Sequence, residues 1–460
     1  MKIRIKNRLI VSDPIPAVRA YCEKNLIIDN PDYYKLEKMG KWTGNTPKKL
    51  WLFEKMNDEL WLPFGCLNDL WKIHPVKDDY IFDISPVIET EYQSNINLYP
   101  YQENAVTAAI KGKNGILVMP CGSGKTQCGL EIIARIGGRA LWLTHTQDLL
   151  NQSKQRAEKV LSQGGYGTIT AGKINVGSTI TFATVQTMAK IDLNSLRDTF
   201  DVIIVDEAQH CAGTPTRVTQ FYKVISNLSA RYKIGLTATP KRADGLQCAM
   251  FALLGQKLHE VSREEVAHTT CPVQVIKIDT EWMPDYECIL MGDGTIDYSK
   301  VIDAMIHDDK RFFKVMDVIN EIPDAAPTLV LANRVEYLQD MLTNYEKTGV
   351  CISGAGQSKK AKAERKAALE KLDNCEIDCI FATYQLAKEG LDVPNLRYVV
   401  FATPEQDSTT VIQSVGRVGR KADGKECGTV IDFVDLFGLY QGYWKKRKGY
   451  YKKIGAEVLE

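Results

Sequence analysis

The sequence predicts an α/β protein with two tandem parallel-sheet domains and a small N-terminal mixed α/β module. Two observations predict this architecture. Short continuous apolar runs alternate with stretches of helical periodicity from about residue 95 to 270, and the same cycle returns from about residue 326. Residues 1 to about 90 differ, because they hold most of the seven tryptophans in short runs such as LWLF. Apolar runs of about five residues between helices are typical of parallel strands covered on both faces.

The N-terminal module is assigned to residues 1–92, and its aromatic residues predict a core of its own. The first parallel-sheet domain is assigned to residues 93–270. Its expected strands are GILVMP, ALWLTH, TITFAT, DVIIVDEAQ and KIGLTAT. One helix is expected to begin at Lys125, and another to run through Leu149 to Val160.

The second domain is assigned to residues 271–440, where a helical connection that also holds the run VQVIKI precedes the strands. Its expected strands are PTLVLANR, VCISG, DCIFATY, RYVVFATP and GTVIDFVD, and its expected helices lie near Val335–Tyr345, Ala361–Leu372 and Thr409–Val415. Residues 441–460 form a basic, aromatic tail with six basic and two acidic side chains. This tail either stacks on and neutralises a nucleic acid or docks as a terminal helix, and the sequence leaves both open.

Composition says little about partners. Lys and Arg number 58 against 57 Asp and Glu, so the net charge of +1 argues neither for nor against a polyanion. No apolar run reaches the roughly 18 residues of a membrane span, and the opening residues lack the apolar core of a secretory signal. We therefore expect a cytoplasmic protein, in a bacterial or phage-infected cell, without a membrane partner. The twelve cysteines contain no CxxC pair, so neither a zinc site nor disulfides are expected.

The stretch MPCGSGKT carries a strong chemical signal. The strand ILVM ends in a glycine-rich turn and a helix follows, so that backbone N–H groups and the helix N-terminus would face an anion. Lys125 would reach the β- and γ-phosphates of a nucleoside triphosphate, and Thr126 would ligate Mg²⁺. A chance glycine turn is the alternative. The expected phosphate cradle comprises Pro120, Cys121, Gly122, Ser123, Gly124, Lys125 and Thr126.

The run DVIIVDEAQH delivers Asp206 and Glu207 at the carboxyl end of an apolar strand, on the edge of the sheet where the phosphate loop would lie. Asp206 can hold Mg²⁺ through water, while Glu207 can orient and polarise the attacking water. Triphosphate hydrolysis requires this division of labour. A solvated pair at a strand end is the alternative. Together the two motifs predict ATP and Mg²⁺ as cofactors.

Two more motifs follow. GLTATP places the hydroxyls of Thr237 and Thr239 at another strand end, where they could connect the hydrolysis site with the rest of the domain.

In QSVGRVGR, spacings of four and three residues predict that Gln413, Arg417 and Arg420 share one side of a helix. An arginine supplied across a cleft can raise the rate of phosphoryl transfer by about 10³ to 10⁵. A surface basic helix is the alternative.

Nine motifs, in this order, resemble those of the superfamily 2 helicases and translocases over about residues 95 to 435. They are LYPYQ, MPCGSGKT, LTHTQDLLNQ, FATVQT, DEAQH, GLTATP, LVLANR, ATYQLAKEGLDVP and QSVGRVGR. Within the superfamily the chain is similar to the XPB-type and restriction-type branch and to phage UvsW-like fork-remodelling and branch-migration helicases. The resemblance implies that both parallel-sheet domains are RecA-like.

The resemblance also assigns roles to single residues. Tyr99 and Gln102 would bind the adenine, with an aromatic core turn as the alternative. Gly390 and Asp392 would couple the nucleotide to the nucleic acid. The catalytic set would comprise Lys125, Asp206, Glu207, Gln413, Arg417 and Arg420. Contacts that track a nucleic-acid strand would come from Thr144, Thr184, Gln186, Asn333, Arg334 and Thr383.

Three positions depart from the family pattern. Met119 stands where a phosphate loop usually has glycine. Gln209 occupies the fourth position of the DEAD/DEAH-type box, and His210 is displaced to the fifth, so neither a DEAD-box nor a strict DEAH protein is indicated. Ala243 replaces the middle acid of an R-E-D stretch, which weakens any strand-separating role for that loop.

The resemblance implies an ATP-dependent DNA helicase and translocase that acts on forked or branched DNA, with 3′ to 5′ polarity. Replication, recombination or repair would be its setting, a monomer is expected, and residues 1–92 would recognise duplex or junction. Two alternatives stay open. One is an RNA-dependent helicase, and the other is a nucleotide-switched DNA-binding module that does not translocate.

Overall fold

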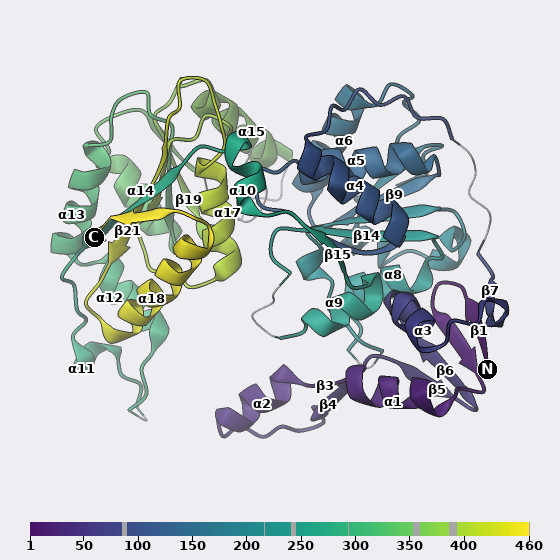
Figure 1. Ribbon diagram of the computed structural model, residues 1–460. Helices are drawn as coiled ribbons and strands as arrows, with labels where there is room; N and C mark the ends of the chain where they lie inside the picture. The colour runs from purple at the N-terminus through teal and green to yellow at the C-terminus, as the bar shows by residue number, and fades with distance from the viewer. Residues whose placement is uncertain are drawn as a thin grey trace. The chain divides into compact units, whose positions relative to one another are not determined.

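The computed structural model describes residues 1–84, 90–215, 217–240, 245–292, 294–352, 359–385 and 393–459. The chain divides into two compact units, residues 1–262 (unit 1) and residues 263–460 (unit 2). Both are built from helices and largely parallel sheets, which confirms the fold class expected from the sequence (Figure 1). Among the described residues, no helix is both long and apolar enough to cross a lipid bilayer.

Unit 1 opens with a five-stranded sheet in the order β5-β6-β2-β1-β7, in which only the β1–β7 pair is parallel. Strands β3 and β4 form a separate two-stranded sheet, and α2 lies in the connection between them. The strands are β1 Lys2–Ile5, β2 Leu9–Ser12, β3 Ile27–Asp29, β4 Lys49–Trp51, β5 Glu54–Met56, β6 Glu59–Leu62 and β7 Tyr80–Phe82. The helices are α1 Pro16–Asn25, α2 Pro31–Lys38, α3 Leu67–Ile73 and the 3₁₀ turns η1 Phe64–Cys66 and η2 Lys77–Asp79.

The rest of unit 1 is an eight-stranded sheet in the order β11-β10-β12-β9-β13-β14-β8-β15, parallel except for the β10–β11 pair. Its strands are β8 Asn114–Val118, β9 Ala140–Thr144, β10 Gly167–Thr170, β11 Lys173–Asn175, β12 Ile180–Thr184, β13 Val202–Asp206, β14 Tyr232–Thr237 and β15 Lys257–Glu260. Its helices are α4 Pro100–Gly112, α5 Lys125–Ile136, α6 Gln147–Val160, α7 Val185–Met188, η3 Leu193–Leu196, η4 Ala208–His210, α8 Gln220–Asn227 and α9 Gln247–Leu254.

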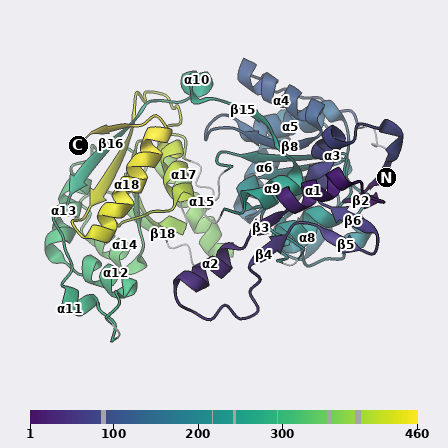
Figure 2. The same ribbon diagram turned by 60° about the horizontal axis from the view of Figure 1, so that its bottom comes forward.

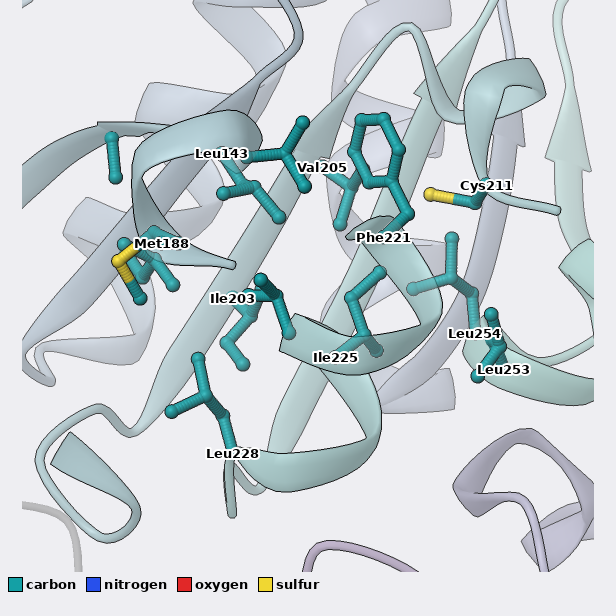
Figure 3. Close-up of a cluster of buried hydrophobic side chains, with 14 of the residues drawn as sticks. Leu143, Met188, Ile203, Val205, Cys211, Phe221, Ile225, Leu228, Leu253 and Leu254 are labelled. Carbon is teal, nitrogen blue, oxygen red and sulfur yellow. The ribbon is translucent and has the colours of Figure 1, made fainter. Parts of the chain in front are cut away.

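Alternation along the buried strands assigns helices to the two faces of this sheet. Leu143 and Ile203 point to the face covered by α7, α8 and α9, where they belong to one cluster with Phe221 (Figure 3). Trp142, the residue before Leu143 on β9, points to the opposite face and packs against α5. There a Cβ added to Gly129 would lie 2.7 Å from the Trp142 ring, so glycine is the residue that this close approach allows.

Unit 2 holds a seven-stranded sheet, parallel throughout, in the order β18-β19-β17-β20-β21-β16-β22. Its strands are β16 Val273–Asp279, β17 Thr328–Ala332, β18 Gly349–Ile352, β19 Cys379–Thr383, β20 Tyr398–Phe401, β21 Gly428–Val434 and β22 Glu457–Leu459. Its helices are α10 Arg263–Val266, η5 Ala267–Thr269, α11 Tyr286–Ile289, α12 Tyr298–Ile306, α13 Asp309–Asn320, α14 Val335–Thr343, α15 Lys359–Asp373, α17 Ser408–Val418 and α18 Gly438–Lys453. The predicted run VQVIKI is thus an inner strand, β16.

The basic tail belongs to the fold of unit 2. Helix α18 buries a stripe made of Tyr440, Trp444, Arg447 and Tyr451, spaced by four, three and four residues. The Arg447 guanidinium makes two bonds to the Asp432 carboxylate, at 2.7 and 2.8 Å, and β22 then pairs with β16. Docking as a helix therefore describes the aromatic half of the tail. Its exposed lysines, Lys445, Lys446, Lys452 and Lys453, leave nucleic-acid binding there a prediction.

The N-terminal module shares a core with the eight-stranded domain. Ala249 and Ala252 of α9 lie in the hydrophobic cluster of the module, beside residues such as Ile3. A Cβ added to Gly65 of η1 would clash with backbone atoms of Ala252 and Gly255. Module and domain therefore meet backbone to backbone.

Lys233, near the start of β14, lies at the seam where the N-terminal module packs against the eight-stranded domain. It is fully buried, and its amine donates to the backbone carbonyls of Ile225 (3.1 Å) and Leu228 (2.8 Å) at the end of α8, and of Asn7 (3.3 Å) in the module. The amine also lies 4.4 Å from the centroid of the Phe64 ring. Burial, with a smaller contribution from a nearby arginine, lowers the pKa of Lys233 from 10.5 to about 7.

This depressed pKa predicts how stability depends on pH. Between pH 7 and pH 10.5 the unfolded chain binds more protons at Lys233 than the folded chain does, so folding becomes more favourable as the pH rises. Lys233→Met removes this contribution. We expect the stability of the wild type to gain on that of Lys233→Met by up to about 1.4 kcal/mol per pH unit in this window.

Urea unfolding of both proteins at about pH 7.5 and about pH 9.5 measures the difference. The control is Lys257→Met, at a half-exposed lysine on the same unit, which should track the wild type at both pH values. An unchanged gap between the wild type and Lys233→Met would mean that the amine is protonated to the same extent in both states.

Candidate functional site

Three motifs lie at the carboxyl edge of the eight-stranded sheet because their strands are neighbours. Strand β14 pairs with β8 on one side and with β13 on the other, all parallel. The phosphate loop follows β8, GLTATP ends β14, and DEAQH follows β13. The Met119 N–H donates to the Thr237 carbonyl at 2.8 Å, so the pairing extends into the loops. Sequence positions more than 100 residues apart, such as Met119 and Thr237, therefore meet at one edge.

The phosphate loop has the backbone that its glycines predict. Gly122 and Gly124 both have φ of +80°, in the region that glycine occupies without strain. Gly124 precedes the first residue of α5, Lys125, so the free N–H groups of the helix face the loop. The Ser123 hydroxyl donates to the Pro120 carbonyl at 2.7 Å and holds the loop closed.

A buried glutamine supports the phosphate loop through hydrogen bonds. Gln102 of α4 is 2 % exposed, and its side-chain amide donates to the Ser123 carbonyl at 2.9 Å. The other end of the amide accepts the Tyr99 N–H at 2.9 Å, and the Tyr101 hydroxyl donates to the same Ser123 carbonyl at 3.2 Å. A Cβ added to Gly124 would clash with the Gln102 amide. Gln102 thus supports the cradle, while adenine contact by Gln102 and by the half-exposed Tyr99 stays a prediction.

Asp206 sits where a cation would be favoured. Its carboxyl group is buried at the end of β13, and burial followed by the Glu207 carboxylate raises its pKa to about 7. The Lys125 ammonium and the Glu207 N–H, which donates to Asp206 at 3.1 Å, act in the opposite direction. A buried carboxylate near the phosphate loop fits the oxygen ligands that Mg²⁺ prefers, and Thr126 remains the predicted second ligand.

A chain of hydrogen bonds links DEAQH to GLTATP. Gln209 donates to the Glu207 carboxylate at 2.7 Å and accepts from the Thr237 hydroxyl at 2.6 Å. The Thr239 N–H donates back to the Thr237 hydroxyl at 3.1 Å. Glu207 itself has φ of +52°, a strained value for a residue with a side chain. Gln209 entered the sequence analysis only as a departure from a motif. Its role required the register of β13 and β14.

The predicted rim of unit 1 is partly buried. Thr144 and Thr184 lie opposite each other on β9 and β12, and their hydroxyls are engaged by Thr146 and Thr187. Gln186 is exposed, and its amide donates to the His145 carbonyl at 2.5 Å.

Two histidines that the sequence analysis did not assign lie behind this rim. The His145 ring lies 4.2 Å from that of His210, centroid to centroid. His145 therefore connects the rim of unit 1 to DEAQH. The adjacency of His145 to the rim residue Thr144 was the one available signal.

The arginine motif of unit 2 departs from the prediction in one respect. Helix α17 ends at Val418, so Gln413 and Arg417 lie on the helix while Arg420 lies beyond it. The expectation that all three share one helical side was wrong, because Gly419 ends the helix. Arg417 is 9 % exposed and Arg420 is partly exposed.

The other predicted residues of unit 2 gather at the carboxyl edge of its sheet. Asn333 and Arg334 follow β17, and Thr383 ends the neighbouring β19. The Asn333 amide donates to the Pro404 carbonyl at 3.2 Å, and Arg334 forms an ion pair with the Asp303 carboxylate at 3.0 Å. Residues 386–392, with Gly390 and Asp392, and residues 241–244 lie outside the described residues.

Known proteins resemble the chain over both units. Residues 95–242 match the family model "Type III restriction enzyme, res subunit", and residues 311–422 match "Helicase conserved C-terminal domain". The chain is 26 % identical over 380 residues to the putative ATP-dependent RNA helicase L396 of Acanthamoeba polyphaga mimivirus, covering 80 % of this chain and 70 % of the relative. It is 26 % identical over 366 residues to the DNA 3′-5′ translocase XPB2 of Sulfurisphaera tokodaii, covering 72 % and 80 %.

A solved structure supports the fold. The fragment of a putative HsdR subunit of a type I restriction enzyme from Vibrio vulnificus YJ016 has a TM-score of 0.57 at 18 % identity. It covers 80 % of this chain and 69 % of that chain. These findings confirm the family resemblance drawn from the motifs.

The link between Glu207 and Thr237 can be tested through its middle member. Gln209→Ala removes both hydrogen bonds and leaves the buried Thr237 hydroxyl without its acceptor. We expect kcat for ATP hydrolysis to fall by about tenfold, because Glu207 loses the donor that orients it. The ATP dissociation constant should change by less than about twofold, since the phosphate loop is untouched.

Steady-state kinetics and equilibrium nucleotide binding measure the two quantities. Gln256→Ala, at an exposed glutamine of the same unit, is the matched control. Loss of nucleotide binding in Gln209→Ala, with kcat at saturation preserved, would place Gln209 in the phosphate cradle instead.

Proposed function

Because the chain belongs to the superfamily 2 helicases of the XPB and restriction type, and is therefore an ATP-driven DNA helicase, we propose that it translocates on DNA and remodels forked or branched duplexes. The observation that carries this proposal is the shared edge of unit 1. There the phosphate loop, the Asp206–Glu207 pair and GLTATP converge, and Gln186 and the two histidines connect the rim to the same edge.

The residues divide the work of hydrolysis. Mg²⁺ bound with ATP would supply Lewis-acid stabilisation of charge on the phosphate oxygens. Lys125 and the N-terminal N–H groups of α5 bind the phosphates. The Glu207 carboxylate, held by Gln209, orients the attacking water and accepts its proton.

The family resemblance implies that unit 2 also contributes to hydrolysis. Gln413, Arg417 and Arg420 would supply positive charge and hydrogen bonds to the triphosphate, so that a change of nucleotide affects both units. Alternating grip by the two rims on a phosphate backbone then produces stepping. Phosphate contacts give affinity without reading sequence, so binding should weaken steeply with salt.

DNA is preferred over RNA because of the relatives. The similar protein of Sulfurisphaera tokodaii is named a DNA 3′-5′ translocase, and on this basis the proposed polarity is 3′ to 5′. The mimivirus relative is named a putative RNA helicase, which keeps an RNA substrate as the rival. The proposal extends to a role in replication, recombination or repair, with the protein acting as a monomer in the cytoplasm.

Recognition of the fork is assigned to an arm of the N-terminal module, residues 31–49. The arm carries five exposed lysines and two acidic residues, and Trp42 is 89 % exposed. Helix α2, its first element, projects from the body of unit 1 in both views (Figures 1 and 2). The base is anchored, since Leu50 forms a cluster with Ala212 and Leu246. Lysines supply phosphate affinity, and an exposed indole offers a face for an unpaired base.

A panel of nucleic acids tests the motor assignment. Initial rates of ATP hydrolysis are measured with single-stranded DNA, duplex, fork, four-way junction and RNA, together with strand displacement. We expect the fork and junction to stimulate most and RNA to stimulate least. Lys125→Ala should abolish hydrolysis and displacement, by at least about 100-fold, while DNA binding without nucleotide is retained.

A nucleotide-switched clamp behaves differently from a motor in this panel. It binds DNA in the presence of ATP but displaces no strand even as the wild type. RNA stimulation equal to that by DNA would favour the rival substrate.

Point substitutions test the arm better than deletion of residues 1–92, because deletion would expose Ala249, Ala252 and Lys233 of the shared seam. We expect Trp42→Ala to weaken fork binding by about tenfold, the value of one lost stack. Stimulation of ATP hydrolysis by single-stranded DNA should be unchanged.

Phe82→Ala, an exposed aromatic of the same module outside the arm, is the control and should bind forks as the wild type does. Fluorescence anisotropy with a labelled fork measures the affinities. Equal losses on forks and single strands would argue against a junction-specific arm.

A further inference from the structure

The segment that enters unit 2 is tied to the loop that carries Arg420. We define the strap as residues 268–272, which follow α10, include the last two residues of η5 and lead directly into β16 (Figure 2). Thr270 pairs with Arg420 in an isolated antiparallel bridge. The Cys271 N–H donates to the Gly419 carbonyl at 2.9 Å. The strap therefore holds the backbone of the two residues that directly follow α17.

Side chains reinforce this pairing. The Lys421 amine donates to the His268 carbonyl at 2.5 Å, and the Cys271 thiol lies 3.5 Å from the Arg420 carbonyl oxygen. These contacts join the strap to Arg420, the last residue of QSVGRVGR, and to Lys421, the residue after it. The backbone of Arg420 thus has neighbours on the strap as well as on its own helix, where its N–H donates to the Arg417 carbonyl at 3.1 Å.

Lys425 completes the arrangement from the other side. It is 8 % exposed, and its amine donates to the Arg420 carbonyl at 2.9 Å and to the Leu396 carbonyl. Burial is the main cause that lowers its pKa to about 8. A nearly buried amine is costly unless it is hydrogen-bonded, so both carbonyls are held in place by it.

The glycines around Arg420 leave little freedom. A Cβ added to Gly419 would lie 3.1 Å from the Val273 side chain, and one added to Gly428 would clash with the Val418 carbonyl. The end of α17, the start of β16 and the start of β21 are therefore packed against one another. This packing holds the backbone of Arg420 in place.

We propose that the strap and Lys425 are positioning elements for Arg420, which fix the backbone from which its guanidinium extends. The strap begins five residues after Arg263, where unit 2 starts. This inference rests on the proposed function, because it takes Arg420 to act on the triphosphate.

A double-mutant cycle tests whether Lys425 acts through Arg420. The variants are Lys425→Met, Arg420→Ala and both together in the full chain, with kcat and KM for DNA-stimulated ATP hydrolysis measured for each. We expect Lys425→Met to lower kcat by about tenfold with KM for ATP within about twofold. In the Arg420→Ala background the same substitution should change kcat by less than about twofold. A structural role would lower kcat by the same factor in both backgrounds.

Two further measurements keep the outcome interpretable. Lys310→Met, at an exposed lysine of the same unit, is the control and should match the wild type. Should Lys425→Met fail to fold, as shown by its melting temperature, Cys271→Ala and Lys421→Ala replace it in the cycle and are expected to lower kcat by about threefold, again only when Arg420 is present.

The two levels of the argument fail separately. A wild-type kcat in Arg420→Ala would remove the proposed role of Arg420 itself. A reduced kcat in Arg420→Ala combined with a wild-type kcat in Lys425→Met, or equal losses in both backgrounds, would overturn the inference and leave the proposed function standing.

Discussion

The parallel pairing of β14 with β8 and β13 is the constraint on which the candidate site depends. Because all three strands run the same way, their carboxyl ends form one edge, and whatever follows each strand is brought to that edge. The 2.8 Å bond from the Met119 N–H to the Thr237 carbonyl carries the register into the loops. The bridge through Gln209 is possible only in that register, since a slip by one residue would turn Thr237 to the other face of the sheet.

Unit 2 uses a different device at the end of its own strand β21. Asp432 and Asp435 are both fully buried, and each is matched by a buried arginine, Arg447 from α18 and Arg311 from α13. Arg311 also donates to the Tyr337 hydroxyl and to the Ala402 carbonyl, so few of its donors lack a partner. Breaking such a pair by removing one member costs about 3–5 kcal/mol, because the remaining charge stays buried. These pairs fix which helices lie beside β21.

Local sequence predicted much of this architecture, for a physical reason. Each strand that carries a motif is a short buried run followed by a turn or a helix start, so its position is encoded within about ten residues. The motif residues of unit 1 accordingly lie at the expected strand ends. Contacts between distant segments were not encoded in this way. The place of β16 inside the second sheet, the buried Lys233 and the bridge between Thr270 and Arg420 all depend on tertiary packing. The wrong prediction for Arg420 has the same cause, because the spacing of Gln413, Arg417 and Arg420 says nothing of the helix end at Gly419.

The close approach at Gly65 has a consequence for how such a protein can change over time. At that point two backbones touch, and no side chain lies between them to absorb a difference in shape. Insertions, swaps or enlarged residues on either side would have to be matched by a change on the other, so the module and its neighbour are expected to be inherited as one piece. Diversity in what the protein recognises is then free to accumulate at the far end of the arm, around Trp42, where the chain has few neighbours to accommodate.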